Sequence, residues 1–222
     1  MTLNFLDLYN ECAGQPWSMY DADAESADDL ETALKIAVNK AVSYLWNFQA
    51  WSFRIAETTI KTKANRAYYS MPNGNIQKKV ISGVTKYSIR YDGTSLEYLQ
   101  DYEEQDEATG EPEYFYIEKD YIYIYPTPDA AYTINVKYLK IPIGYDEDGN
   151  AIYELTNETD YIDIPEKYEK LFKNCIISLA MIYAIADESD ENHSGYEKQY
   201  EDSLAVLLKY CKNGLMDKSL VW

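Results

Sequence analysis

The apolar residues of this chain repeat with a helical period at both ends and with a period of two in between. Between residues 28 and 48 they are spaced by three and four, as on one face of an amphipathic helix. From Ser52 onward, apolar and polar residues alternate, as in half-buried strands. A helical spacing returns after Pro165, a residue type that is favoured where helices begin. This order of periods predicts a mixed fold in which strands interrupt a set of helices.

The helical segments are expected to pack as one bundle. Two helices predicted after Pro165 are joined by a polar hinge at 187–192, so they can form an antiparallel pair against the 28–48 helix. A short helix is also predicted at about 2–12. The predicted fold class is therefore α+β, a helical bundle of three to four helices with an inserted antiparallel β-rich domain. The expected boundaries are 1–51 and 160–214 for the bundle, 52–159 for the inserted domain and 215–222 for a C-terminal tail.

Strict alternation of Tyr and Ile marks the stretch 121–125, YIYIY, which a Pro-Thr-Pro segment separates from a second alternating run at 132–138. With a strand at 114–118, these runs are expected to form an antiparallel meander, because their connections are too short for a parallel crossover. Asp92-Gly93 predicts a hairpin turn. Further short strands are predicted at 76–81, 85–91 and 94–99.

The alternation places Tyr121, Tyr123 and Tyr125 on one face of their strand and two isoleucines on the other. A carbohydrate-stacking platform is one interpretation of such a tyrosine face. Because both faces carry large side chains, both are expected to be covered, and tyrosine suits an interface that stays partly wet. Sheet packing and subunit contact are therefore favoured for these three residues.

The chain carries a formal net charge of −18. This charge argues against a protein that wraps nucleic acid, which needs clustered Lys and Arg to neutralise phosphates. Solubility is the simplest role of the acidity, and a surface that repels something anionic is the more specific one. The longest uncharged apolar run, residues 175–186, is too short to cross a bilayer, so no membrane partner is predicted.

The residue types that most catalytic and metal sites need are scarce. The one histidine, His193, is expected in a solvated loop, and the three cysteines are far apart and expected to be buried and reduced. No catalytic triad, zinc site or phosphate-binding loop is therefore predicted. The acidic turn at 146–150 lacks the glycine and glutamate spacing of a calcium loop. No catalytic residue, cofactor or metal site is predicted. The three cysteines that are expected to be buried and reduced are Cys12, Cys175 and Cys211.

Several segments follow one another in a characteristic order. WNFQAWSFR ends a helix, TTIKT and YYSMP follow, and YIYIYPTPD precedes DIPEKYEKLFKNCIISLA, which opens an apolar helix. This order resembles that of the head–tail adaptor proteins of tailed bacteriophages, also called connector, ring or tail tubular proteins. The resemblance extends over nearly the whole chain.

The resemblance implies a non-enzymatic structural protein of the virion, located at the head–tail junction or in the tail and assembled in the host cytoplasm. Members form a homo-oligomeric ring, commonly of twelve copies, that docks on the portal protein and extends the DNA channel. Neighbouring tail or ring proteins are further partners, and DNA passes through without specific binding. In several members the C-terminal segment reaches the portal, which assigns that contact here to Leu215, Met216, Leu220, Val221 and Trp222.

In such a ring, acidic residues on the channel surface would repel DNA and keep it sliding, the reverse of what a DNA-binding protein does. Two other classes of function stay open at this point. One is a carbohydrate-binding or fibre-type module, which would use the tyrosines. The other, less favoured, is a carboxylate-dependent glycoside hydrolase, since two carboxylates suffice for that chemistry. Most acidic residues, however, lie in runs that are typical of solvated loops.

Overall fold

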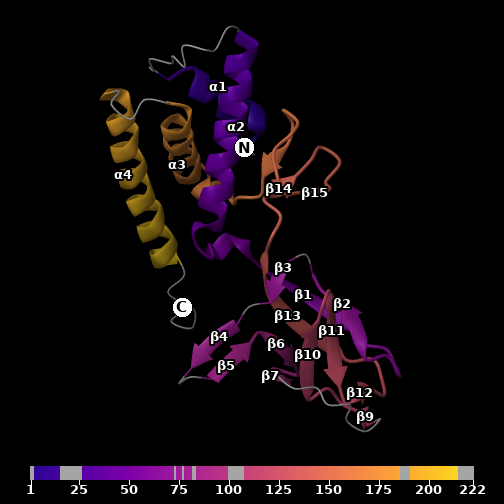
Figure 1. The fold of residues 1–222 in the computed structure, drawn as a ribbon. Coiled ribbons are helices and arrows are strands. Elements are labelled where there is room, and N and C mark those ends of the chain that lie inside the picture. Colours follow the sequence, from indigo (N-terminus) through magenta and orange to yellow (C-terminus); the bar gives the residue numbers. More distant parts are fainter. Residues whose placement is uncertain are drawn as a thin grey trace. The chain divides into compact units, whose positions relative to one another are not determined.

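The computed structural model describes residues 3–15, 27–72, 74–76, 78–81, 84–99, 108–185 and 191–214. These residues combine α-helices with several mostly antiparallel sheets, so the predicted α+β class is confirmed (Figure 1). The chain divides into two compact units. We call Met1–Phe53 with Pro142–Met216 the helical unit, and Arg54–Ile141 the β unit. Residues 142–159 thus lie in the helical unit, whereas the sequence places them with the inserted β domain.

The helical unit contains the four described helices and one small sheet. The helices are α1 (Phe5–Ala13), α2 (Ala27–Phe48), α3 (Glu166–Ala184) and α4 (Glu191–Gly214). The sheet has the order β15-β14-β16 and consists of β14 (Gly144–Tyr145), β15 (Ala151–Ile152) and β16 (Tyr161–Ile162). A 3-10 turn, η1 (Ser52–Arg54), follows α2 at the division between the units.

Helix α3 is the centre of the helical unit and packs against α2 on one side and α4 on the other (Figure 1). Its middle is buried almost all round, as its apolar sequence predicts. Trp51 stacks on Phe53 with ring centroids 5.8 Å apart, and Phe172 of α3 meets both rings edge-on. The Trp51 indole N–H also donates to the Leu45 carbonyl at 2.7 Å, which ties the end of α2 into this core. These stacked and edge-on ring contacts add to the stabilisation that comes from burying apolar area.

Helices α1 and α4 do not begin where the sequence predicts, and α1 starts at Phe5 rather than near residue 2. Asn4 caps α1 by accepting from the Asp7 amide at 2.7 Å. Helix α4 starts at Glu191, within the segment 187–192 that is predicted to be a hinge, and His193 is only 8% exposed in its first turn. The expectation of a solvated loop histidine is therefore wrong. His193 lies three residues before the buried Tyr196, on the side of α4 that faces the core.

The β unit is built from two main sheets. The first has the order β1-β13-β6-β7, with β3 also paired to β13, and the second has the order β2-β11-β10-β8. The first consists of β1 (Ile55–Lys61), β3 (Gly74–Ile76), β6 (Ile89–Tyr91), β7 (Thr94–Ser95) and β13 (Thr133–Lys140). The second consists of β2 (Tyr68–Ser70), β8 (Glu97–Tyr98), β10 (Tyr114–Glu118) and β11 (Tyr121–Tyr125). Two further pairs are β4 (Lys78–Ile81) with β5 (Val84–Tyr87), and β9 (Thr109–Gly110) with β12 (Thr127–Pro128).

The two main sheets pack face to face around one apolar cluster. Ile89, Ile134 and Val136 come from the first sheet, and Phe115 and Ile122 from the second, and all five are fully buried. Each sheet therefore has an inner face in this cluster and an outer face directed away from it. The β unit is a small sandwich of the kind that period-two sequences form.

The predicted three-stranded meander is only half correct. β10 and β11 form the expected antiparallel hairpin, but β13 does not continue it and instead lies between β1 and β6 in the other sheet. Pro126 and Pro128 explain the break, because a proline lacks the N–H group that a strand needs to extend a ladder. The chain therefore leaves the second sheet after Tyr125 and re-enters the first at Thr133.

The other predicted strands exist in shorter pieces. The segments predicted at 76–81, 85–91 and 94–99 are each divided into two strands. The hairpin turn between β6 and β7 is confirmed. Asp92 and Gly93 both have positive φ angles, 46° and 75°, as a two-residue turn of this type requires.

Candidate functional site

The predicted site residues fall into two groups. The tail residues predicted to bind the portal or an adjacent ring lie outside the described residues. They are Leu215, Met216, Leu220, Val221 and Trp222. The predicted subunit-contact residues, Tyr121, Tyr123 and Tyr125, lie on β11 near the middle of the second sheet of the β unit.

The three tyrosines of β11 belong to a larger aromatic surface. The strand register aligns tyrosines from β2 and β10 beside them, because directly paired residues of neighbouring strands point to the same side. We call the resulting surface the tyrosine face. It consists of Tyr68, Tyr114, Tyr116, Tyr121, Tyr123 and Tyr125.

The rings of the tyrosine face contact one another across the strands. Tyr116 and Tyr123 are stacked with centroids 4.5 Å apart and an interplanar angle of 11°. The ring centroid of Tyr68 lies 5.6 Å from that of Tyr121, with the two rings nearly perpendicular, and 5.8 Å from that of Tyr123. Tyr114 and Tyr125 lie 6.3 Å apart at the other end. Such mutual contacts hold the rings in one layer and reduce their freedom before any partner binds.

The tyrosine face is open to solvent in this chain. Tyr68 is 48% and Tyr121 39% exposed, whereas Ile122 and Ile124 on the reverse side of β11 are buried in the sandwich core. The alternation is thus as predicted, but the expectation that both faces are covered is not met by the described residues of one chain. A layer of half-exposed rings is a surface that another molecule can cover.

Arg66 fixes one edge of the tyrosine face. Its guanidinium carbon lies 5.4 Å from the ring centroids of both Tyr68 and Tyr69, and its Nε donates to the Tyr68 carbonyl at 3.0 Å. The Tyr69 hydroxyl in turn donates to the Arg66 carbonyl at 2.6 Å. This edge shows that a guanidinium is accommodated beside these rings.

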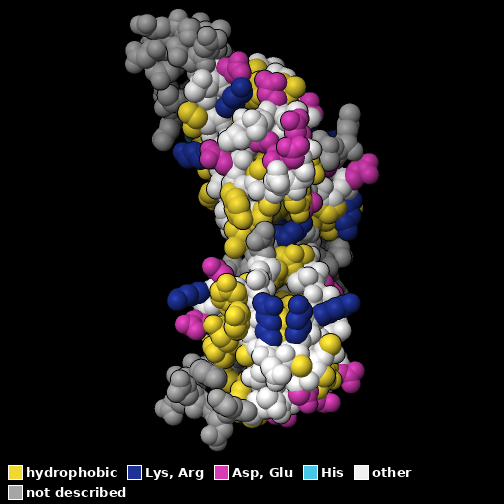
Figure 2. Space-filling view, turned by 90° about the vertical axis from the view of Figure 1, so that its right-hand side faces the viewer, with side chains coloured by type: hydrophobic (Ala, Val, Ile, Leu, Met, Phe, Trp, Pro, Cys, Tyr) yellow, Lys and Arg dark blue, Asp and Glu magenta, His cyan; other side chains and the backbone are white. Residues whose placement is uncertain are grey.

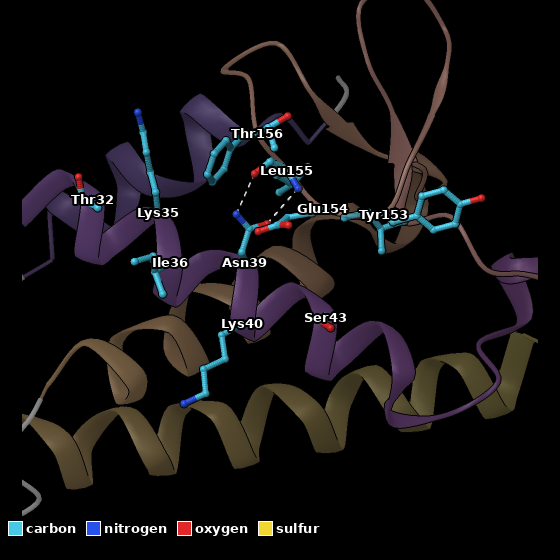
Figure 3. Close-up of a pocket in the computed structure, with 12 residues that line it drawn as sticks. Thr32, Lys35, Ile36, Asn39, Lys40, Ser43, Tyr153, Glu154, Leu155 and Thr156 are labelled. Atoms are coloured by element: carbon cyan, nitrogen blue, oxygen red, sulfur yellow. Dashed lines mark hydrogen bonds between the residues drawn. The ribbon is translucent and has the colours of Figure 1, made fainter.

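A second surface feature, which the sequence did not indicate, is a groove on the helical unit. It has a volume of about 480 Å³ and runs between α2 and the segment 153–156 (Figure 3). Asn39 holds the two sides together: its Nδ2 donates to the Leu155 carbonyl at 2.8 Å, and the Leu155 amide donates to its Oδ1 at 2.9 Å. Ile36 and Tyr153 on the two sides are 64% and 61% exposed. An apolar residue at Ile36, outside the buried stripe of α2, is the one sequence signal that points here.

The charges around the groove are already partly engaged. Lys35 Nζ lies 2.6 Å from a carboxylate oxygen of Glu31 and 4.7 Å from the Tyr9 ring centroid. Lys40 Nζ lies 4.1 Å from the ring centroid of Tyr183 on α3. The lining offers amide, hydroxyl, ammonium and apolar groups, which suit binding rather than bond cleavage.

The buried ionisable groups have structural surroundings. Burial raises the pKa of the Cys12 and Cys175 thiols to about 12, and that of Cys211 to about 11. All three are free and buried, as predicted, and a thiol that stays protonated is a poor nucleophile. Within the ranges that the structure describes, no group of three His, Cys, Asp or Glu side chains is placed to hold a metal ion.

Asp160 is a fully buried carboxylate that sequence reasoning missed. Its Oδ2 accepts from the amides of Thr156 and Asn157 at 2.7 and 2.8 Å, and from the Thr156 hydroxyl at 3.1 Å. Burial acts to raise its pKa, but these hydrogen bonds outweigh burial and hold the pKa below its usual value. Because its hydrogen-bond donors belong to its own loop, the ionised Asp160 carboxylate stabilises that loop. The loop adjoins segment 153–156, which forms one side of the groove.

Comparison with known proteins identifies the family. The sequence model of the SU10 adaptor proteins matches residues 5–217, which include both units. No curated protein matches the chain. None of the described helices is long and apolar enough to cross a membrane. The chain therefore belongs to the SU10 adaptor protein family, a family of bacteriophage head–tail adaptors, and is a structural protein of a phage.

Proposed function

We propose that the chain forms a closed ring of twelve copies that docks on the portal protein and extends the DNA channel into the tail. Membership in an adaptor family supports a location in the virion and a non-enzymatic role. The observation that carries the proposal is the tyrosine face, a preformed layer of six rings that one chain leaves only partly covered, with Tyr68 and Tyr121 the most exposed. A ring of identical subunits needs such a surface on every copy.

Tyr121, Tyr123 and Tyr125 take the role of subunit contacts in this proposal. Tyrosine buries a large ring while its hydroxyl can stay hydrated, so the face suits a chain that is produced as a monomer and then assembles. The domain arrangement proposed with it is a helical bundle that carries the β domain as an insertion. The two compact units support this arrangement.

The residues after α4 are proposed as the contact with the portal or an adjacent ring. Leu215, Met216, Leu220, Val221 and Trp222 are apolar and follow the last helix. Burying apolar side chains against a partner removes them from water and is favourable. The resemblance to head–tail adaptors assigns the same segment to this contact.

The acidity supports a channel that does not hold DNA. The helical unit contains 24 acidic and 8 basic residues, whereas the β unit contains 13 and 11. Figure 2 shows acidic side chains distributed over the helical unit. We propose that this unit supplies the acidic channel surface, where Asp and Glu side chains repel the phosphates of DNA.

Imaging of virions tests the proposal. A ring with twelvefold symmetry next to the portal, into which this chain fits, is the expected result. A location at the periphery of the particle would rule the proposal out. A basic channel surface, with the acidic residues only outside, would remove the DNA-sliding role but leave the adaptor role intact.

A carbohydrate-binding or fibre-type module is the second candidate, because half-exposed tyrosines can stack on sugars. The geometry makes it the weaker one: Tyr116 and Tyr123 lie face to face at 4.5 Å, so the facing sides of their rings are not available to a ligand. Binding to a glycan array by the monomeric chain, abolished by Tyr68→Ala and Tyr121→Ala, would favour this candidate.

A further inference from the structure

The β sandwich has a second outer face with a different chemistry from the tyrosine face. On the first sheet, Lys61, Arg90 and Lys137 all point away from the core, as their exposed positions and strand register show. On the same face, the Oε1 atom of Glu57 lies 2.6 Å from the Nζ atom of Lys137 and forms an ion pair with it. The neighbouring outward side chains are short and polar, namely Thr59, Ser95, Thr133 and Asn135. We call this surface the basic face.

The basic face and the tyrosine face lie on opposite sides of the sandwich. Each belongs to one of the two sheets, and the inner faces of both sheets meet in the same apolar cluster. One sandwich therefore presents two unlike surfaces in opposite directions.

The tyrosine face also carries two carboxylates, from Glu97 and Glu118. Glu97 of β8 is paired with Tyr114, and Glu118 of β10 is paired with Tyr121, so both carboxylates share the outer side with the rings. Both glutamates are exposed. The face thus combines the negative ring faces of six tyrosines with two carboxylates at opposite ends of the sheet.

We propose that the basic face of one copy docks on the tyrosine face of the next copy, an inference that rests on the proposed ring. The contacts would be cations over tyrosine rings and ion pairs with Glu97 and Glu118. Arg66 already makes contacts of the first kind with Tyr68 and Tyr69 within the chain. Such a contact is attractive when water is excluded from it.

Pairing of unlike faces is favoured over pairing of like faces. Two basic faces would bring Lys61 and Arg90 against the same positive groups of the neighbour, and two tyrosine faces would bring the glutamates together. A contact between unlike faces on opposite sides of one unit repeats from copy to copy, which closes into a ring when the rotation allows it. The proposed interface therefore also accounts for a ring rather than a dimer.

Charge reversal with mutual rescue tests the proposal. The first variant combines Lys61→Glu and Arg90→Glu, and the second combines Glu97→Lys and Glu118→Lys. Each is supplied in the host to a phage that lacks the gene, and the ring at the head–tail junction and the infectious titre are measured. Each variant alone is expected to lower the infectious titre by about tenfold or more, because every contact between neighbouring copies in the ring is weakened.

Supplying both variants together should restore the ring. The reversed basic face of the first variant matches the reversed tyrosine face of the second, and the two unchanged faces match each other. The double substitution Lys198→Glu with Lys209→Glu, at exposed positions on α4, is the matched control and should assemble normally. Circular dichroism and thermal unfolding of the purified variants check that each is folded.

Three outcomes would overturn the proposal. They are normal assembly of either variant alone, failure of the two folded variants to rescue each other, and loss of duplex DNA binding in the first variant when the wild-type chain binds that DNA. The last outcome would assign the basic face to DNA. If the wild-type chain itself were absent from the head–tail junction, the proposed function would fail, whereas a normal ring built from either variant would refute only this interface.

Discussion

At the scale of single residues, Asp160 is the polar group on which the loop before β16 depends most. Its carboxylate accepts hydrogen bonds from two amides and one hydroxyl while fully buried. Asp160→Ala leaves those donors without a partner, so we expect the free energy of unfolding to fall by roughly 2 to 3 kcal/mol. Urea denaturation at neutral pH measures this loss. Asp148→Ala, at an exposed position in the nearby turn, is the control and should change stability by less than about 0.5 kcal/mol.

The same residue should respond to acid in a defined direction. Hydrogen bonding holds the pKa of Asp160 in the folded chain below its value in the unfolded chain. The ionised carboxylate therefore contributes fully to the free energy of unfolding at pH values above the unfolded pKa. This contribution is lost as the pH falls through the folded pKa. The stability difference between wild type and Asp160→Ala should therefore shrink below pH 3.8. A difference that stays constant from neutral pH to acid would show that the carboxylate does not supply the stability.

The buried thiols predict that the free energy of unfolding depends on pH in the alkaline range. The pKa of Cys12 and of Cys175 is about 12 in the folded chain, against 9.0 for an exposed thiol, because burial disfavours the thiolate. The unfolded chain then loses these protons first. Stability is complete below pH 9 and falls as the pH rises toward 12, by about 1.4 kcal/mol per pH unit for each thiol. Denaturation at several pH values measures the slope, and Cys175→Ala should reduce it by one thiol's share.

At the scale of elements, the clamp between α2 and segment 153–156 can be separated from the rest of the fold. Asn39→Ala removes both hydrogen bonds to Leu155 and leaves that backbone unpaired. We expect a loss of roughly 1 to 3 kcal/mol and faster amide exchange at 153–156, with α3 unchanged. Hydrogen exchange read by mass spectrometry checks this. Asn47→Ala is the matched control, since the Asn47 Nδ2 donates to the Ser43 carbonyl one turn away within α2 at an exposed position.

The sequence predicts the elements of this fold better than their partners. The 28–48 helix and the β10–β11 hairpin are confirmed, because hydrophobic period and short turns act locally. The position of β13 was wrong, because strand neighbours depend on which distant strand completes a sheet, here β1. The burial of His193 was missed for a related reason: a polar helix start gives no sign of the surface that covers it.

The candidate sites show the same limit. The tyrosines of β11 were found from their alternation, but the contributions of Tyr68 and Tyr114 depend on strand register. The groove was not found, because it lies between α2 and a loop more than a hundred residues later in the chain. A period can show which residues share a face of one element, but not which element lies beside it.

At the scale of the whole molecule, the tail should affect assembly and not folding. Replacing Leu220, Val221 and Trp222 with serine removes apolar side chains from the proposed portal contact. We expect an unchanged unfolding midpoint but weaker binding to the portal, because the lost contacts exist only in the complex. Co-sedimentation with purified portal rings measures binding. Lys218→Ser, in the same tail, is the control, and equal binding of the triple variant and wild type would remove the tail from the contact.

The pairing of β1 with β13 has a consequence for how this architecture changes over time. The first strand of the β unit lies along its last, with Ile55 opposite Leu139, so the chain enters and leaves the unit at neighbouring points. A module whose two ends meet can be transferred between genes as one continuous piece. A phage lineage could thus acquire a different sandwich, with different outer faces. The coding sequence of the helices before and after the insertion would stay unchanged.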